Sequence, residues 1–217
     1  MANSDGAVAA RRAALGFTWL ALIAWAVFVA PAGDGQDPTR IVRWLQLDGP
    51  PLLVAIFNLL GVWPLVYGAV LLRDPPERVP AWPFVGLSFA TGAYALLPYL
   101  ILRTWGTPGR AELGRVRSVM TGRAMAGGLL IASLALVGGG LALGDFASLA
   151  EEAPRSGLVT TMTADFVVVT ITWWALLLDD VRRHDGPAWS AALGAIPIVG
   201  APLWLLLRPR PSRAAES

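Results

Sequence analysis

The sequence predicts an all-α integral membrane protein, a bundle of about six transmembrane helices joined by short polar loops. Of its 217 residues 55% are hydrophobic and only 15% are charged, and the mean hydropathy is +0.58. A soluble domain carries about a quarter charged residues. The hydrophobic residues also fall into blocks of about 20, the length that a helix rising 1.5 Å per residue needs to cross a bilayer core about 30 Å thick.

The blocks predict one membrane domain followed by a polar tail at 208–217. The predicted transmembrane helices lie at about 13–30, 51–72, 83–102, 124–143, 158–178 and 191–207. The first follows Arg11-Arg12 and ends beside small residues that resemble a signal-peptide cleavage site. Its length and the bulky Trp19 and Trp25 favour a retained helix over a cleaved signal.

The connections differ in character. Residues 33–49 interleave charged and apolar side chains, which indicates a short helix lying at the membrane interface. The second block ends in a charged double-proline turn at 73–78, where a helix cannot continue. The stretch 103–123 is basic and is expected to be a loop facing solvent or headgroups, helical in part. No internal repeat is evident.

The orientation in the membrane does not follow from the arginines alone. Six crossings put both termini on one side, and 8 of the 17 arginines then lie on that side and 9 on the other. The basic ends of the chain favour cytoplasmic termini, in the cell (inner) membrane.

Composition excludes several kinds of chemistry. The chain has no Cys and no Lys, which removes thiolate metal sites and the Schiff base of a retinal pigment. Its single histidine, His184, lies outside the blocks, so no haem or di-iron ligands are expected and no cofactor is predicted. The arginines are dispersed, which favours contact with the lipid bilayer and gives no indication of nucleic-acid binding.

One carboxylate, Asp165, lies inside a hydrophobic block. A charged group at that depth costs several kcal/mol and marks a candidate ligand or proton site. Thr161 precedes it by one helical turn, and Thr91 and Tyr94 are expected at similar depth on the third helix. Asn58 is expected about 10 Å away along the membrane normal. These five residues are the candidate site residues, and no catalytic residue is identified.

Each candidate also has a structural interpretation. Asp165 can tie helices together in a protonated or hydrogen-bonded form, and Asn58 can make an interhelical hydrogen bond. Asp179-Asp180 with Asp185 resembles an aspartate-rich magnesium motif. Arg182 and Arg183 interrupt it and no second acidic motif faces it, so a solvated loop with local ion pairs is favoured and no metal site is predicted.

Three segments carry a resemblance to known proteins. The stretches 57–65, 80–84 and 95–99 resemble a group of uncharacterised multi-pass membrane proteins of bacteria and photosynthetic eukaryotes, mainly over residues 51–102. The group has no assigned activity, so the resemblance implies membrane topology and no site.

Two classes of function remain open. The leading expectation is a non-catalytic membrane protein, either a binding or assembly partner of other membrane subunits or a small carrier of a hydrophobic molecule with its polar centre at Asp165. The alternative is an enzyme acting on a lipid or isoprenoid, with Asp165 as acid or base and Tyr94 assisting. A path from Asp165 to one face of the membrane would favour the carrier, and a pocket joining it to the lipid would favour the enzyme.

Overall fold

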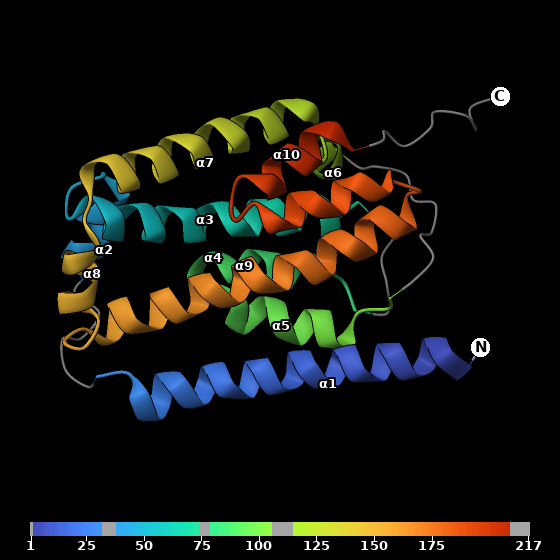
Figure 1. The fold of residues 1–217 in the computed structure, drawn as a ribbon, viewed down its shortest axis with the longest axis horizontal. Coiled ribbons are helices and arrows are strands. Elements are labelled where there is room, and N and C mark those ends of the chain that lie inside the picture. Colours follow the sequence, from blue (N-terminus) through green and yellow to red (C-terminus); the bar gives the residue numbers. More distant parts are fainter. Residues whose placement is uncertain (1, 32–37, 74–78, 106–114, 209–217) are drawn as a thin grey trace.

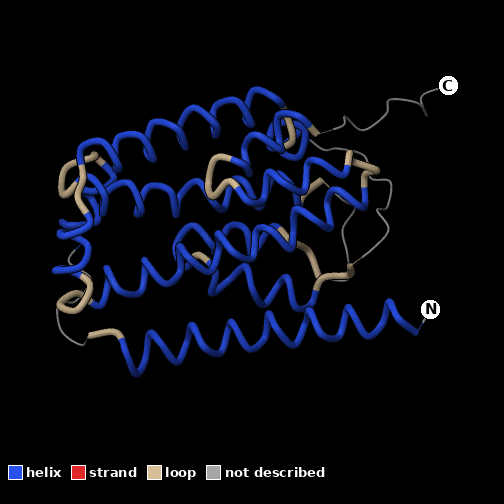
Figure 2. Tube along the Cα trace, in the orientation of Figure 1, coloured by secondary structure: helices blue, strands red, loops and turns tan. Residues whose placement is uncertain are grey.

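The computed structural model describes residues 2–31, 38–73, 79–105 and 115–208. Within these residues all regular structure is helical and there is no strand, as Figure 2 shows. Four helical segments are long and apolar enough to cross a membrane. They are α1 (Ala2–Ala24) with its π-helical continuation η1 (Trp25–Val29), α3 (Pro51–Leu71), α7 (Arg123–Leu143) and α9 (Gly157–Arg183). The all-α prediction is confirmed, and the predicted number of about six crossings is not.

The third and sixth predicted helices are each broken in two. The segment predicted at 83–102 forms α4 (Trp82–Thr91) and α5 (Ala93–Leu102), separated by Gly92 with φ 54°. The segment predicted at 191–207 forms the 3-10 helix η2 (Ala188–Ala195) and α10 (Gly200–Leu207). A helical arm of eight to ten residues rises only about 12–16 Å, too little to cross a bilayer.

The bundle has two distinct ends (Figure 1). At the basic end α1 and α7 begin while α3 and α9 finish, and Arg73 after α3 lies 3.9 Å from Asp180 near the end of α9. At the far end α3 and α9 begin, while α7 and the η1 continuation of α1 finish. Two short helices also lie there, α2 (Pro38–Leu45) and α8 (Phe146–Glu152). The short helix expected within 33–49 is therefore confirmed at Pro38–Leu45.

The helices α4 and α5 form a hairpin that enters the bundle from the basic end and returns to it. Near its start, Val85 packs beside Gly68 of α3. At its apex, Gly92 contacts Asp165 of α9. Beyond its second arm, Arg103 lies 3.2 Å from Asp179. Because the α-helical stretch from Asp165 to Asp179 rises about 21 Å, the hairpin reaches about that far into the bundle.

The segments η2 and α10 form a second, shallower hairpin from the same end. Near its apex, Gly194 packs against Trp174 of α9. On its returning arm, the indole N–H of Trp204 donates to Asp180 Oδ2 over 2.8 Å. The stretch of α9 from Trp174 to Asp180 rises about 9 Å, so this hairpin reaches less than half as far as the first.

The same order of elements occurs twice along the chain. A long helix, a short helix, a second long helix and a hairpin appear as α1–α2–α3–α4/α5 and again as α7–α8–α9–η2/α10, with α6 (Arg115–Met120) between them. In each half the first long helix packs on the second arm of its own hairpin and the second long helix packs on the first arm. Each second arm also reaches the other half, α5 against α9 and α10 against α3. The order of the elements and these packing relations therefore recur in the two halves of the chain.

No internal repeat was evident from the sequence, and the sequence similarity between the two halves is confined to short segments of the hairpins. Both hairpins begin with the same tripeptide, Pro80-Ala81-Trp82 and Pro187-Ala188-Trp189. Both end in an aromatic residue, three aliphatic residues and an arginine, at 99–103 and at 204–208. The long helices share too little to reveal the duplication, because many different apolar residues satisfy the same packing.

The two halves meet at an aromatic cluster between α3 and α9. Trp63 and Trp173 have ring centroids 6.1 Å apart, and Tyr67 lies 5.9 Å from each of them. The Tyr67 hydroxyl donates to the carbonyl of Val169 over 2.9 Å. Large exposed apolar side chains lie on α1, η1, α7 and α9: Phe17, Phe28, Ile131 and Ile171. Such exposed side chains suit helices surrounded by lipid.

Two further predictions concern the ends of elements. Arg208, assigned to the polar tail, is buried and donates to the carbonyl of Ala69 over 3.0 Å. The rest of that tail, 209–217, lies outside the described residues, as does 106–114 of the basic stretch. The described remainder of that stretch contains α6, in agreement with the partly helical loop that was expected.

Candidate functional site

A cavity of about 800 Å³ lies between η1, the far-end halves of α3 and α9 and the apex of the first hairpin. All five candidate residues line it: Asn58, Thr91, Tyr94, Thr161 and Asp165. They come from α3, from both arms of the hairpin and from α9, so residues more than 100 positions apart share one site. Asn58 lines the same cavity as the other four residues, although it was expected to lie apart from them.

Asp165 is nearly buried, with 5% of its surface exposed, and it fastens the hairpin apex. Its Oδ1 accepts a hydrogen bond of 2.6 Å from the main-chain N–H of Ala93, the first residue of α5. A carboxylate at a helix N-terminus is stabilised by the partial positive charge of the unpaired N–H groups there. The carboxylate also fills the space that a side chain on residue 92 would need.

Gly92 is the functional residue that the sequence reasoning missed. A Cβ on this residue would overlap the Asp165 carboxylate, and its φ of 54° is strained for residues with a side chain. The available signal was an isolated glycine in the middle of an apolar block, in the sequence Thr91-Gly92-Ala93. Such a glycine indicates a break or a close approach of the backbone.

Three of the other candidates donate their hydrogens to main-chain carbonyls. Asn58 Nδ2 donates to Trp44 O over 2.8 Å and to Val54 O over 2.9 Å, and the first of these bonds joins α3 to α2. The Tyr94 hydroxyl donates to Leu22 O over 3.2 Å and the Thr91 hydroxyl to Leu87 O over 3.0 Å. Among the described residues none of the candidate side chains is hydrogen bonded to Asp165.

The residues that line the cavity extend from Asp165 to the far end of the bundle. Its outer part is lined by the segments in which α1 and α2 finish and α9 begins: Ala30, Pro31, Leu45 and Gly157. Its walls are mainly apolar, with Phe57, Leu60, Phe89, Leu158 and Met162. Asp165 is the one residue with a formal charge among the described residues that line it.

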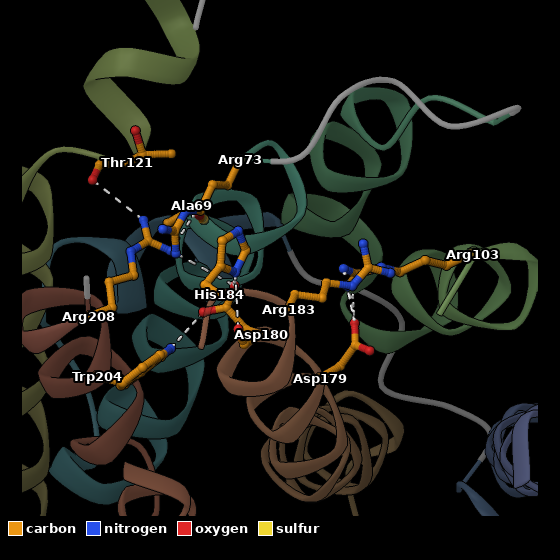
Figure 3. Close-up of polar contacts among 10 residues, drawn as sticks. All are labelled: Ala69, Arg73, Arg103, Thr121, Asp179, Asp180, Arg183, His184, Trp204 and Arg208. Atoms are coloured by element: carbon orange, nitrogen blue, oxygen red, sulfur yellow. Dashed lines mark hydrogen bonds and ion pairs between the residues drawn. The ribbon is translucent and has the colours of Figure 1, made fainter. Parts of the chain in front are cut away.

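A second polar cluster closes the basic end, and Figure 3 shows it. Asp179 lies 2.6 Å from Arg183 and 3.2 Å from Arg103, which follows the first hairpin. All three side chains are at least nine-tenths buried. The two guanidinium groups therefore share one carboxylate away from water.

Its neighbour Asp180 holds the second hairpin. Its carboxylate accepts the Trp204 N–H and lies 3.2 Å from His184 Nδ1 and 3.9 Å from Arg73. Arg208 continues the cluster and donates to main-chain carbonyls of α3 and of the turn before α7. The first hairpin is thus fastened to the end of α9, and the second to the ends of α9 and α3.

These contacts correct the interpretation of the aspartate pair. Local ion pairs were expected, and they are present, but the expected solvated loop is wrong because Asp179 and Asp180 are buried within α9. Asp185 is exposed and lies beyond the helix. No group of three potential metal ligands occurs among the residues described.

Comparison of the chain with protein-family models, with curated proteins and with solved structures gave no significant match. The resemblance to uncharacterised multi-pass membrane proteins stays a prediction. The fold and the site by themselves define a helical protein with four helices able to cross a membrane, two helix-and-hairpin units in the same order and a cavity lined by an aspartate.

Proposed function

We propose that the chain is a small carrier in the cell membrane, with four crossing helices and two hairpins that enter from the cytoplasmic side. Its cavity admits a small molecule with a hydrophobic part, and Asp165 is the polar centre. The supporting observation is the pairing of a cavity that leads from Asp165 to the far end with a buried ionic cluster at the basic end. A site open to one side and closed to the other is what alternating access requires.

The hairpins support an orientation that six crossings left undecided. Ten of the described arginines lie at the basic end and three at the far end. The ten are Arg11, Arg12, Arg73, Arg103, Arg115, Arg117, Arg123, Arg182, Arg183 and Arg208; the three are Arg40, Arg43 and Arg155. Arginine is enriched in cytoplasmic loops, so we place the basic end and the termini in the cytoplasm and the mouth of the cavity outside.

Cysteine labelling tests this orientation, because the natural chain has no cysteine. Glu151 in α8 and Arg182 near the end of α9 are both exposed and lie at opposite ends. We expect Glu151→Cys to react with a membrane-impermeant maleimide on intact cells, and Arg182→Cys to react only after the cells are opened. The reverse pattern, or equal labelling of both, would contradict the orientation.

The alternative of a lipid-modifying enzyme lacks the tyrosine assistance that was expected beside the aspartate. The hydroxyls of Tyr94 and Thr91 donate to main-chain carbonyls, so neither is directed at the carboxylate as an assisting acid. The residues that line the cavity also extend to the far end of the bundle, which supports a carrier. We therefore favour transport over catalysis, and binding over a purely structural role.

Filling the cavity tests whether it binds a small molecule. Gly61 lines the cavity, and a Cβ there meets nothing within 4 Å, so Gly61→Leu puts a side chain into the open space. We expect purified Gly61→Leu to lose a small molecule that mass spectrometry detects in the native protein, and Asp165→Asn to retain less than a tenth of it, about 1.4 kcal/mol of binding. Gly127→Leu is the matched control, since Gly127 is also open but lies on α7 away from the cavity.

The outcomes distinguish a carrier, an enzyme and a protein whose cavity binds nothing. Loss of the bound molecule in Gly61→Leu and Asp165→Asn, with retention in Gly127→Leu, supports the carrier. If both cavity variants fold and keep every bound species, the cavity is not a binding site. If a cavity variant accumulates a chemically unconverted form of the molecule, the protein is an enzyme.

A further inference from the structure

The polar groups of the cavity are mostly hydrogen-bond acceptors. The side-chain N–H and O–H groups of Asn58, Thr91 and Tyr94 donate to main-chain carbonyls. The oxygen lone pairs of these side chains can therefore accept hydrogen bonds from other partners. Ser88 also lines the cavity, and its hydroxyl donates to Val85 O over 2.7 Å. A molecule that enters the cavity therefore meets acceptors on several sides.

The strongest acceptor is the Asp165 carboxylate. The N–H of Ala93 uses Oδ1, and an ionised carboxylate has about four lone-pair sites, so it can accept further hydrogen bonds. Thr161 lies one helical turn before Asp165 on the same face of α9, and both line the cavity. Together they provide a charged acceptor with a hydroxyl beside it.

The cavity has an acidic residue and no basic one to balance it. No Arg or His occurs among the described residues that line it, whereas Asp165 lies there in mainly apolar surroundings. A buried carboxylate is costly unless a positive group or several hydrogen bonds compensate it. The basic cluster lies about 21 Å away along α9, too far for a direct contact.

From these observations we propose that the cavity binds an amphipathic organic cation, a primary ammonium on an apolar body, with the ammonium at Asp165 and Thr161. An ammonium supplies one positive charge and three N–H donors, which matches one carboxylate surrounded by acceptors. Its apolar body fits walls that include Phe57, Leu60 and Met162. This inference rests on the proposed carrier function and names the class of its ligand.

A series of matched ligands tests the ligand class. 4-Phenylbutylammonium, 4-phenylbutanol and 4-phenylbutanoate share one apolar body and differ in the charge of the polar group. Binding to the full chain in phosphatidylcholine nanodiscs is measured by calorimetry at neutral pH. We expect the ammonium to bind about tenfold more tightly than the alcohol, because a charge-assisted hydrogen bond is stronger than a neutral one, and the carboxylate to bind more weakly than both.

Two variants and a control assign the selectivity to the site. In Asp165→Asn the ammonium and the alcohol should bind equally, within about twofold. Thr161→Val keeps the carboxylate and the hairpin contact, and should weaken the ammonium by about threefold to tenfold while leaving the alcohol unchanged. Glu151→Gln removes the same charge from an exposed position outside the cavity and should leave all three affinities unchanged.

The inference is overturned if the alcohol or the carboxylate binds as tightly as the ammonium to the natural chain. It is also overturned if none of the three binds, or if folded Asp165→Asn keeps the preference for the ammonium. Should Asp165→Asn not fold, an unchanged ammonium affinity in Thr161→Val overturns it instead. Equal binding of the three ligands that Gly61→Leu abolishes would leave the carrier in place and remove only its preference for cations.

Discussion

The two hairpins start from the same plan and differ at their tips. Each begins with Pro-Ala-Trp, enters from the basic end and finishes in an arginine that reaches the opposite half of the chain. The tip of the first lies about 21 Å deep, holds a polar contact to Asp165 and borders the cavity. The tip of the second lies about 9 Å deep, where Gly194 and Gly200 pack closely on Trp174 and Leu193.

The difference shows how two units with the same order of elements can differ at one end. At their bases both hairpins have polar contacts to the ends of long helices, the first to α9 and the second to α9 and α3. At the tips, one copy fills its space with side chains and the other leaves an opening beside a carboxylate. Variants at the shared bases are expected to have larger effects than variants at the differing tips.

The largest effect is expected at the bases, from Asp179→Asn. This change leaves Arg103 and Arg183 buried without the carboxylate they share, and breaking a buried ion pair in this way costs about 3–5 kcal/mol. The free energy of unfolding is measured in detergent by tryptophan fluorescence. Glu152→Gln is the control, since the Arg40–Glu152 pair at the far end is partly exposed and should contribute less than about 1 kcal/mol. Equal effects of the two changes would show that the bases do not fasten the hairpins.

A smaller effect is expected at the first tip, from Gly92→Ala. The strained φ and the overlap with Asp165 should destabilise the fold by about 1–3 kcal/mol. Gly86→Ala on the same hairpin should be neutral or stabilising, because a Cβ there meets nothing within 4 Å. The same unfolding measurement compares the two.

The double variant Gly92→Ala with Asp165→Ala distinguishes the two tips further. Shortening the aspartate removes the overlap, so the double variant should cost less than the sum of the single changes. At the second tip a Cβ on Gly200 meets the main-chain carbonyl of Leu193, and no side-chain change can relieve it. Strict additivity at Gly92 and Asp165 would mean that the carboxylate does not determine the shape of the first tip.

The sequence allowed the helical class, the long helices and the candidate residues to be predicted for physical reasons. A block of about 20 apolar residues must be covered by lipid or protein, and an aspartate within such a block must find a partner. Whether the third and sixth blocks cross the membrane or turn back as hairpins could not be predicted in this way. A hairpin and a crossing helix have the same apolar composition, and they differ in single positions such as Gly92, whose conformation depends on contact with α9.

The predicted number of crossings also explains why the orientation was undecided. Six crossings distribute 103–123 and 182–185 to the side opposite the termini, whereas two hairpins return both stretches to the same side. The contacts that fasten these hairpins join residues far apart in the chain, such as Arg103 with Asp179. Such pairs cannot be read from local patterns, because several arginines and acids are equally available.

The contacts of each second arm with the other half of the chain affect the order in which the protein can assemble during synthesis. The partners of the first hairpin, Asp165 at its tip and Asp179 at its base, both belong to α9. During synthesis the first half therefore leaves the ribosome before these two carboxylates exist, and its hairpin is then held by α1 and α3 alone. The cavity takes shape only after α9 has been inserted, so a chain that ends before Gly157 would have the first hairpin without either of its anchors.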